Sequence, residues 1–440
     1  MASTALQFPD QDAHRRWLAE QAGLPVGFRV GSHSFDFVPI EVGKPARMTA
    51  SVVVADEPCE AFAACFTRNA FPGAPVLIGR QRLHEAALQA VLINNKISNV
   101  CAPDGVATAQ ACCAAVGAAL DIPAERVLPS STGVIGWRLP LTELQQAIPY
   151  AVAAGQRESI LPLATGIMTT DGWPKVRCAT LPGGGRLVGV AKGAGMIEPN
   201  LATMLVFLFT DVAIARDELR RSLQQAVDRS FNRISIDSDQ STSDTVLAMA
   251  SARLPAVDDQ VFNNALERVC GDLAEDVVRN GEGVHHVIRC RVSGAPTELI
   301  ARSVGKAVIN SPLLQCAICG NDPNVGRLLM AVGKYLGNDH PGLDTSHTRI
   351  AIAGETVFEH GSFTLDTARE TRLSRALQAA EMYASVAPDD QGVFAPPIAY
   401  PPHEHCVDIA IDLGLANGKA AVLGADRTHE YISENADYRS

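Results

Sequence analysis

The sequence predicts a mixed α/β fold, because short runs of β-branched and other apolar residues alternate with segments of helical periodicity along the chain. The chain has 440 residues, of which 47% are hydrophobic and 19% are charged. This length exceeds what one hydrophobic core usually fills, and the composition is that of an ordinary enzyme. We find no repeat of fixed period and no low-complexity segment. The sequence therefore predicts two or three structural units.

Four apolar runs are predicted to be strands, each bounded by turn residues. They are residues 49–56 (TASVVVAD), 75–80 (PVLIGR), 90–95 (AVLINN) and 204–209 (MLVFLF). The glycine triplet at 183–185 is interpreted as a hairpin turn and not as a phosphate-binding loop. The first 45 residues are polar and weakly periodic, so residues 1–45 are interpreted as an N-terminal extension.

Two amphipathic helices are predicted after the last of these strands. Residues 219–235 place apolar side chains on one face at steps of three and four, and residues 262–279 repeat this pattern before Asn280 and Gly281 end the helix. Residues 392–406 are rich in proline. This stretch is expected to form a surface loop.

The overall charge excludes several classes of function. The formal net charge of -11 argues against a general nucleic-acid or membrane-surface partner.

The N-terminus lacks the apolar run of a secretory signal, and no segment approaches the roughly 18 apolar residues of a membrane span. The 11 cysteines lie mostly in apolar surroundings, which is typical of a reducing compartment. We expect a cytoplasmic protein without a disulfide framework.

A glycine-containing loop at 192–200, in which Pro199 fixes one backbone angle, leads into Ala202 and Thr203 at the start of a predicted strand. An isolated threonine in this position is most often only a β-branched strand residue. A threonine hydroxyl becomes a useful nucleophile when a base lies beside it. If the bond between Ala202 and Thr203 were cut, the new α-amino group of Thr203, with a pKa of about 7.7–8.0, would be such a base.

The stretch KGAGMIEPNLATML at 192–205 resembles the signature of the ornithine acetyltransferase (glutamate N-acetyltransferase) family, whose precursor cleaves itself before a threonine that then carries the acyl group. Further matching segments follow the family's order. They are SSTGVIG (130–136), IMTTD (167–171), SIDSDQSTSDT (235–245), NGEG (280–283), GNDPNVGR (320–327) and ENADYRS (434–440). The resemblance covers residues from about 45 to 440. It implies a layered α/β sandwich of the N-terminal-nucleophile type, cut into an α-chain region (46–202) and a β-chain region (203–440).

The resemblance also implies roles for individual residues. Thr203 is the expected nucleophile, and Thr132 and Gly133 match the family's oxyanion pair, which would stabilise the negative charge that develops during acyl transfer. The other expected residues bind substrates that carry an α-carboxylate and an amine. They are Thr169 (with Thr170 as the adjacent alternative), Lys192, Thr203, Glu282, Asn435 and Ser440, where the family usually ends in threonine.

By resemblance, Thr203 takes an acetyl group from an N-acetyl amino acid such as N-acetylornithine and passes it to glutamate or a related amine, as in arginine biosynthesis. The two fragments would stay associated, in an α2β2 assembly, and no metal or organic cofactor is implied. Two alternatives stay open. Water could replace the amine acceptor, giving an amidase or aminopeptidase, or the chain could be a non-catalytic protein that binds an amino-acid derivative.

The chain departs from the family pattern in several places. Residues 94–101 read NNKISNVC where the family usually has a stretch resembling NSGNAN, so Lys96 and Ile97 are expected to crowd or recharge a loop near the active site. His285 and His286 replace the alanine, threonine and lysine that tend to follow the NGEG segment, and Val325 replaces a tryptophan. These differences indicate a divergent member.

Three further patterns are not interpreted as metal sites. Cys316 and Cys319 have CxxC spacing but no second pair at the distance of a zinc ribbon. The HEHC sequence at 403–406 follows prolines and lacks histidines at helical spacing. The acidic stretch that begins at Asp237 lacks the glycine and the glutamate of a calcium-binding loop, which excludes calcium there.

Overall fold

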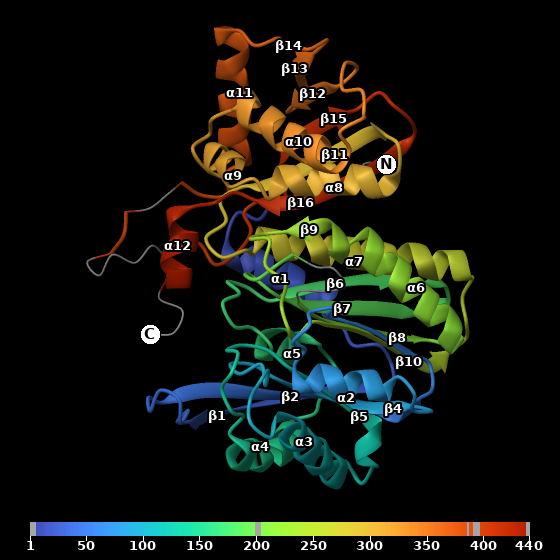
Figure 1. Cartoon of the computed structure of the whole chain (residues 1–440). Coiled ribbons are helices and arrows are strands. Elements are labelled where there is room, and N and C mark those ends of the chain that lie inside the picture. The colour runs from blue at the N-terminus through green and yellow to red at the C-terminus, as the bar shows by residue number, and fades with distance from the viewer. Residues whose placement is uncertain (1–5, 199–203, 385–386, 390–396, 437–440) are drawn as a thin grey trace. The chain divides into compact units, whose positions relative to one another are not determined.

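The computed structural model describes residues 6–198, 204–384, 387–389 and 397–436 (Figure 1). The chain forms two compact units. The sandwich unit consists of Arg15–Asn232 and Gln240–Val277, and the seven-stranded unit consists of Met1–His14, Arg233–Asp239 and Val278–Ser440. Among the described residues, none of the helices combines the length and the apolar character needed to cross a membrane.

The sandwich unit contains two sheets. The four-stranded sheet has the order β1-β2-β4-β5 and consists of β1 (Phe28–Phe37), β2 (Ala46–Cys59), β4 (Leu88–Asn94) and β5 (Val127–Ser131). The five-stranded sheet has the order β3-β10-β8-β7-β6 and consists of β3 (Phe62–Phe66), β6 (Lys175–Thr180), β7 (Arg186–Lys192), β8 (Leu205–Val212) and β10 (Thr245–Leu254). One buried cluster joins Val53 and Val91 of the first sheet to Phe207 and Leu247 of the second. The two sheets therefore share a core.

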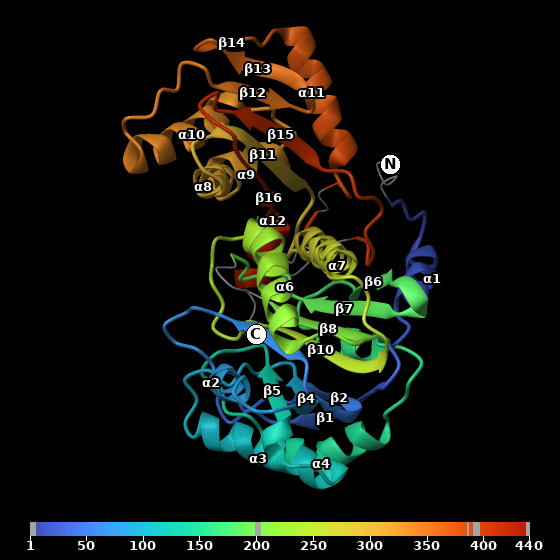
Figure 2. The same cartoon turned by 90° about the vertical axis from the view of Figure 1, so that its right-hand side faces the viewer.

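Helices α3 (Gly105–Leu120) and α4 (Leu141–Ala153) cover the outer face of the four-stranded sheet, and α6 (Arg216–Arg229) and α7 (Asp259–Arg279) cover that of the five-stranded sheet (Figures 1 and 2). The unit also contains α1 (Gln11–Gln21), which begins before Arg15, α2 (Ala74–Arg82) and α5 (Leu161–Gly166), each of which contributes to the core that the two sheets share. Val116 of α3 and Ile148 of α4 pack against Val52 and Leu92 of the four-stranded sheet. On the other side, a methyl group at Gly189 of β7 would lie only 2.8 Å from Leu273 of α7. The order helix, sheet, sheet, helix confirms the predicted layered α/β sandwich.

Most predicted elements of this unit are present. Residues 49–56 lie in β2, residues 90–94 in β4 and residues 205–209 in β8. β8 is buried along its whole length between the antiparallel β7 and the parallel β10, which explains the unbroken apolar run at 205–209. The glycine triplet joins the antiparallel β6 and β7, as expected for a hairpin. The helix predicted over 262–279 is the main part of α7.

The prediction of a strand over 75–80 is wrong, because these residues form α2. Pro75 occupies the first turn of the helix, where its missing N–H leaves no hydrogen bond unmade. A short apolar run does not distinguish a buried strand from a buried helix by periodicity alone. Gly79 packs so closely against Phe66 that an added methyl group would lie 2.6 Å from the ring.

The helix predicted over 219–235 is also too long, because α6 ends at Arg229. Ser230 leaves the helical region, and Ile234 then enters β9 (Ile234–Ser235). At the other end of the unit, the residues interpreted as an N-terminal extension contribute α1 and β1. β1 pairs with β2 along its whole length, from Phe28 opposite Ala55 to Phe37 opposite Ala46.

The seven-stranded unit is built around one sheet with the order β14-β13-β12-β15-β11-β16-β9. Its strands after β9 are β11 (Val287–Ala295), β12 (Arg349–Ile352), β13 (Glu355–Glu359), β14 (Ser362–Phe363), β15 (Val407–Asp412) and β16 (Gly418–Ala425). Its helices are α8 (Glu298–Ile309), α9 (Pro312–Cys319), α10 (Val325–Asp339), α11 (Thr367–Ala380) and α12 (His429–Ala436). Gly305 lets α8 approach β16, since an added methyl group would lie 2.7 Å from Val422. The described part of the proline-rich segment, residues 397–406, contains neither helix nor strand.

Candidate active site

Thr132 and Gly133 lie directly after β5, at the edge where the parallel strands β4 and β5 both end. The N–H of Thr132 donates to the carbonyl oxygen of Asn94, the last residue of β4, over 3.0 Å. Neither the Thr132 hydroxyl nor the Gly133 N–H makes a hydrogen bond with the part of the chain that the structure describes. Thr132 is 8% exposed. Two donors at this strand end are therefore uncommitted.

Gly133 is required by the backbone at this position. Its φ is +123°, and an added methyl group would lie 2.1 Å from the carbonyl carbon of Lys96. The Lys96 carbonyl oxygen also accepts a hydrogen bond from the N–H of Val134 over 2.9 Å. The loop after β4 thus presses directly against the turn that carries Thr132 and Gly133.

The loop at 94–101 contains Lys96 and Ile97, the two residues that distinguish it from the family pattern. Ile97 is fully buried and packs in the core between the four-stranded sheet and its helices, whereas Lys96 is exposed. Lys96, Asn99 and Cys101 have positive φ angles of 71°, 54° and 52°, which favour glycine or asparagine. The Asn94 amide bridges the loop, donating to the Ile97 carbonyl over 2.8 Å and accepting from the Ser131 hydroxyl over 2.6 Å.

A buried carboxylate connects the segment of Thr169 with the loop that follows β7. Asp171 accepts the N–H of Thr169 at Oδ2 over 3.0 Å and the N–H of Gly193 at Oδ1 over 2.9 Å. Lys192, the last residue of β7, precedes Gly193 and is half-buried. One side chain therefore holds the backbone of Thr169 and the peptide bond that follows Lys192. The Asn95 amide adds a link by donating to the Met168 carbonyl over 3.0 Å.

Asp171 is charged although it is buried. Its Oδ1 forms an ion pair with the ammonium group of Lys175, and both side chains are almost completely inaccessible to solvent. Burial by itself would raise the pKa of the Asp171 carboxyl, but the charges of Lys175 and Lys192 and the hydrogen bond from Gly193 outweigh it and lower this pKa to about 2. Burial lowers the pKa of Lys175, and Asp171 opposes that shift.

A second buried carboxyl, that of Asp244, lies beside the start of β8. Thr245 pairs with Leu205, and the Thr245 N–H donates to the Met204 carbonyl over 3.0 Å, so Asp244 is placed next to Met204. Burial raises the pKa of Asp244 well above its ordinary value, against the opposing effects of the Ser241 and Thr67 hydroxyls, the Met204 N–H and the Lys192 charge. Its Oδ2 has no hydrogen-bond partner among the described residues.

In the seven-stranded unit, Glu282 and Asn435 meet. The Asn435 Nδ2 donates to Glu282 Oε2 over 2.8 Å and to the Tyr431 carbonyl over 3.0 Å. Glu282 precedes β11 and is buried, whereas Asn435 lies on α12. The Tyr431 hydroxyl in turn donates to Asp237 over 3.4 Å. The carboxylate of Glu282 is thereby held in one orientation by a side chain 153 positions away.

The expected site residues divide between the two units and the undescribed segments. The sandwich unit holds Thr132, Gly133, Thr169 and Lys192, and the seven-stranded unit holds Glu282 and Asn435. The expected nucleophile Thr203, the preceding Ala202 and the terminal Ser440 lie outside the described residues.

Sequence reasoning missed Asp171 and Asp244 as contributors to this region. Both occur in segments that carry the family resemblance, IMTTD and SIDSDQSTSDT. A lone aspartate next to threonines is most often a turn residue, so the residue types alone give no signal. The hydrogen bonds that distinguish Asp171 connect residues up to 22 positions apart and depend on the fold.

Comparison with known proteins adds to this geometry. The sequence model of the ArgJ family matches residues 38–440. The "Arginine biosynthesis bifunctional protein ArgJ" of Nitratidesulfovibrio vulgaris is 36% identical over 425 residues, which cover 94% of this chain and 99% of that protein. The "Arginine biosynthesis bifunctional protein ArgJ 2" of Clostridium acetobutylicum is 37% identical over 319 residues, which cover 72% of this chain and 81% of that protein.

Solved structures also match. One is the ornithine acetyltransferase of Mycobacterium tuberculosis in complex with ornithine, with 32% identity and a TM-score of 0.36, over 45% of this chain and 100% of that one. Another is the arginine biosynthesis bifunctional protein ArgJ of Bacillus halodurans, with 28% identity and a TM-score of 0.43, over 52% of this chain and 97% of that one.

Proposed function

This chain belongs to the ArgJ family, and from that membership we propose that it is a self-processing acyltransferase of arginine biosynthesis whose nucleophile is Thr203. It moves an acetyl group from an N-acetyl amino acid, such as N-acetylornithine, to glutamate or a related amine. The observation that carries the proposal is the match over 38–440, because this range contains every candidate site residue. Curated relatives named as arginine biosynthesis enzymes support the pathway.

The first proposed step is self-cleavage. The Thr203 hydroxyl attacks the Ala202 carbonyl carbon, the bond from that carbon to the Thr203 nitrogen breaks, and the nitrogen takes a proton. Water then hydrolyses the resulting ester, which leaves a carboxylate on Ala202 and a free α-amino group on Thr203. Fragments 1–202 and 203–440 stay together in this proposal, as an α2β2 assembly in the cytoplasm.

In the second proposed step, the Thr203 amine removes the hydroxyl proton while the oxygen attacks the acetyl carbonyl of the donor. The C–N bond of the donor breaks, its amine leaves with a proton, and the acetyl group remains on Thr203. The amine of glutamate then attacks the ester, which forms N-acetylglutamate and restores the hydroxyl. No redox reagent or metal enters this cycle.

Thr132 and Gly133 are proposed to stabilise the oxyanion of both acyl-transfer steps. Their uncommitted hydroxyl and N–H at the end of β5 support this role. Donors fixed before the reaction cost no reorganisation when the charge develops, and one such donor typically contributes about 2.7–4 kcal/mol. The close contact between Gly133 and the Lys96 carbonyl keeps the Gly133 N–H in place.

The polar substrate groups have candidate partners of both signs. We propose that Lys192 and Thr169 bind the α-carboxylate, and that Glu282, with Asn435 and Ser440, binds the amine. The common anchoring of Thr169 and Gly193 on Asp171 supports the first set. The hydrogen bond from Asn435 to Glu282 supports the second set.

One experiment tests the proposal at both stages. Intact-mass measurement and Edman sequencing of the purified protein are expected to give a fragment that starts at Thr203, and Thr203→Ala is expected to stay whole. The processed protein, given N-acetylornithine and glutamate, is expected to form ornithine and N-acetylglutamate in equal amounts. Free acetate in equal yield with and without glutamate would identify a hydrolase instead. An intact wild-type chain without either activity would overturn the proposal.

A further inference from the structure

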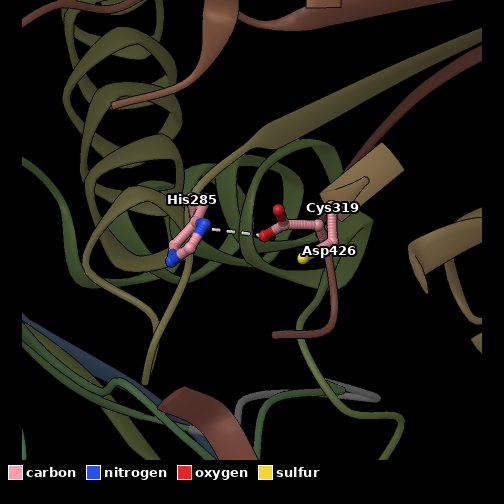
Figure 3. A group of neighbouring side chains, drawn as sticks. All are labelled: His285, Cys319 and Asp426. Atoms are coloured by element: carbon pink, nitrogen blue, oxygen red, sulfur yellow. Dashed lines mark hydrogen bonds between the residues drawn. The ribbon is translucent and has the colours of Figure 1, made fainter. Parts of the chain in front are cut away.

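A group of potential metal ligands lies in the seven-stranded unit, and none of its members is assigned to acyl transfer. One ligand atom each of His285, Cys319 and Asp426 lies within 4.8 Å of the others. Figure 3 shows the Asp426 carboxylate directed toward His285, with the Cys319 side chain beside it. His285 precedes β11, Cys319 ends α9 and Asp426 follows β16. The fold therefore brings three separate elements to one point.

His285 is fully buried, and neither of its ring nitrogens has a hydrogen-bond partner among the described residues. Its Nε2 lies 3.1 Å from Glu430 Oε1, in an orientation that does not make a hydrogen bond. The ring of Tyr383 covers it edge-on, with 4.5 Å between the ring centroids. A buried polar group without a hydrogen-bond partner costs free energy, which a bound ligand can offset. Both ring nitrogens of His285 are available to such a ligand.

Glu430 is a second buried group without hydrogen-bond partners among the described residues. It is fully buried, and neither of its carboxylate oxygens has a hydrogen-bond partner within the described chain. The separation of 3.1 Å between Glu430 Oε1 and His285 Nε2 is close to the roughly 3.3 Å expected for two oxygen or nitrogen ligands of one tetrahedral zinc ion. The spread of 4.8 Å is that of the ligand atoms of His285, Cys319 and Asp426, and it would have to contract by about 1–1.5 Å to suit one tetrahedral ion.

The charge of the surroundings favours a cation. The carboxyl groups of Asp426 and Glu430 are both buried, and the Glu381 carboxylate lies 3.9 Å from His285 Nδ1. A metal ion would offset the buried carboxylates and would displace the thiol proton, since a coordinating thiol binds as the thiolate.

The surrounding hydrogen bonds orient the ligands. Asp426 Oδ1 accepts a hydrogen bond from the backbone N–H of His285 over 3.0 Å, and Asp426 Oδ2 lies 2.7 Å from His286 Nδ1. His286 Nε2 lies 3.2 Å from Asn321 Oδ1, so both of its ring nitrogens face oxygen atoms. Ligating carboxylates in metal sites are typically held by such outer partners.

We propose that His285, Cys319, Asp426 and Glu430 bind one divalent transition-metal ion, of which zinc fits best. One thiolate, one imidazole and two carboxylates give four ligands without an open position, and a closed set of four is the geometry of structural zinc sites. The ion would join the end of α9 and the end of β16 to the segment before β11 and to α12. The exposed Cys316 is not one of the ligands, so this is not a CxxC site.

A metal-free alternative consists of two histidine–carboxylate pairs, His286 with Asp426 and His285 with Glu430. The experiment that separates the two uses the full chain grown with zinc and freed of loosely bound metal. We expect elemental mass spectrometry to find about one zinc ion per chain. Exchange for Co²⁺ should give d–d bands in the visible and a thiolate-to-cobalt band in the near ultraviolet.

Two variants of neighbouring cysteines provide the matched comparison. Cys319→Ser is expected to abolish the thiolate-to-cobalt band, and Cys316→Ser is expected to retain it. His286→Ala should weaken metal binding about 10–100-fold, as outer-shell changes do. Zinc well below one ion per chain after titration with excess zinc, or equal spectra of the two cysteine variants, would overturn the proposal. Because the readout is metal content and absorption, failure of the acyltransferase assay leaves this test unaffected.

Discussion

Asn435 donates a hydrogen bond from Nδ2 to Oε2 of Glu282 over 2.8 Å. The acceptor is a buried carboxylate next to the strand β11, and the donor lies on the helix α12. A hydrogen bond to a charged group contributes about 1.5–3 kcal/mol. The position of Glu282 therefore depends on α12.

Asn435→Ala is expected to lower kcat/KM for glutamate about 10–100-fold, because the Glu282 carboxylate loses the donor that orients it. Steady-state kinetics with varied glutamate measure the effect. Ile432→Ala is the control, since Ile432 lies on the same helix and is 58% exposed. Equal kinetics of the Asn435 and Ile432 variants would show that the hydrogen bond does not serve the reaction.

The exchange Gly133→Ala is expected to abolish acyl transfer and to destabilise the protein. Its methyl group would meet the Lys96 carbonyl carbon at 2.1 Å, so the turn that carries the proposed oxyanion donors has to move. Gly136→Ala is the matched control, because Gly136 also has a positive φ, of +86°, but an added methyl group there meets nothing within 4 Å. Backbone strain alone costs about 1 kcal/mol. Product formation and thermal unfolding of both variants check this, and retained activity in Gly133→Ala would contradict it.

The structure shows which parts of the molecule could be predicted from sequence. β8 was predictable because a strand buried on both faces needs a continuous apolar run. The apolar run at 75–80 led to a wrong prediction of a strand, because a short run of this kind is equally compatible with a buried helix such as α2. Glu282 and Asn435 were expected only through the family resemblance. The role of Asp171 was not predictable, since it depends on the Gly193 N–H, which reaches it only in the folded chain.

Asp171→Asn is expected to reduce the free energy of unfolding by about 3–5 kcal/mol, because it leaves the Lys175 ammonium group buried without its ionic partner. The double variant Asp171→Asn with Lys175→Met is expected to recover much of this loss, since no uncompensated charge remains. Denaturant unfolding at neutral pH measures both. A loss below about 1 kcal/mol in the single variant would contradict the importance of the pair.

The Asp171 carboxylate also makes the free energy of unfolding depend on pH. The pKa of Asp171 is about 2 in the folded protein against an ordinary value of 3.8, so the unfolded chain binds more protons between these values. The contribution of Asp171, about 2–3 kcal/mol, is therefore complete above pH ~5 and is lost as the pH falls toward 2. Unfolding of the wild type and of the double variant between pH 6 and pH ~2.5 should show a smaller decrease in the variant. Parallel curves would refute this assignment.

Asp244→Asn is expected to be at least as stable as the wild type at pH ~8, although it replaces a fully buried carboxyl. Burial raises the pKa of Asp244 well above 3.8, so in this case the folded protein binds more protons than the unfolded chain. Wild-type stability should fall as the pH rises from about 4 through the raised pKa, and the neutral asparagine should remove that slope. Unfolding measured at several pH values tests this. Asp239→Asn is the control for a general charge effect, and an Asp244→Asn variant that is destabilised equally at every pH would show that Asp244 is needed as a carboxylate.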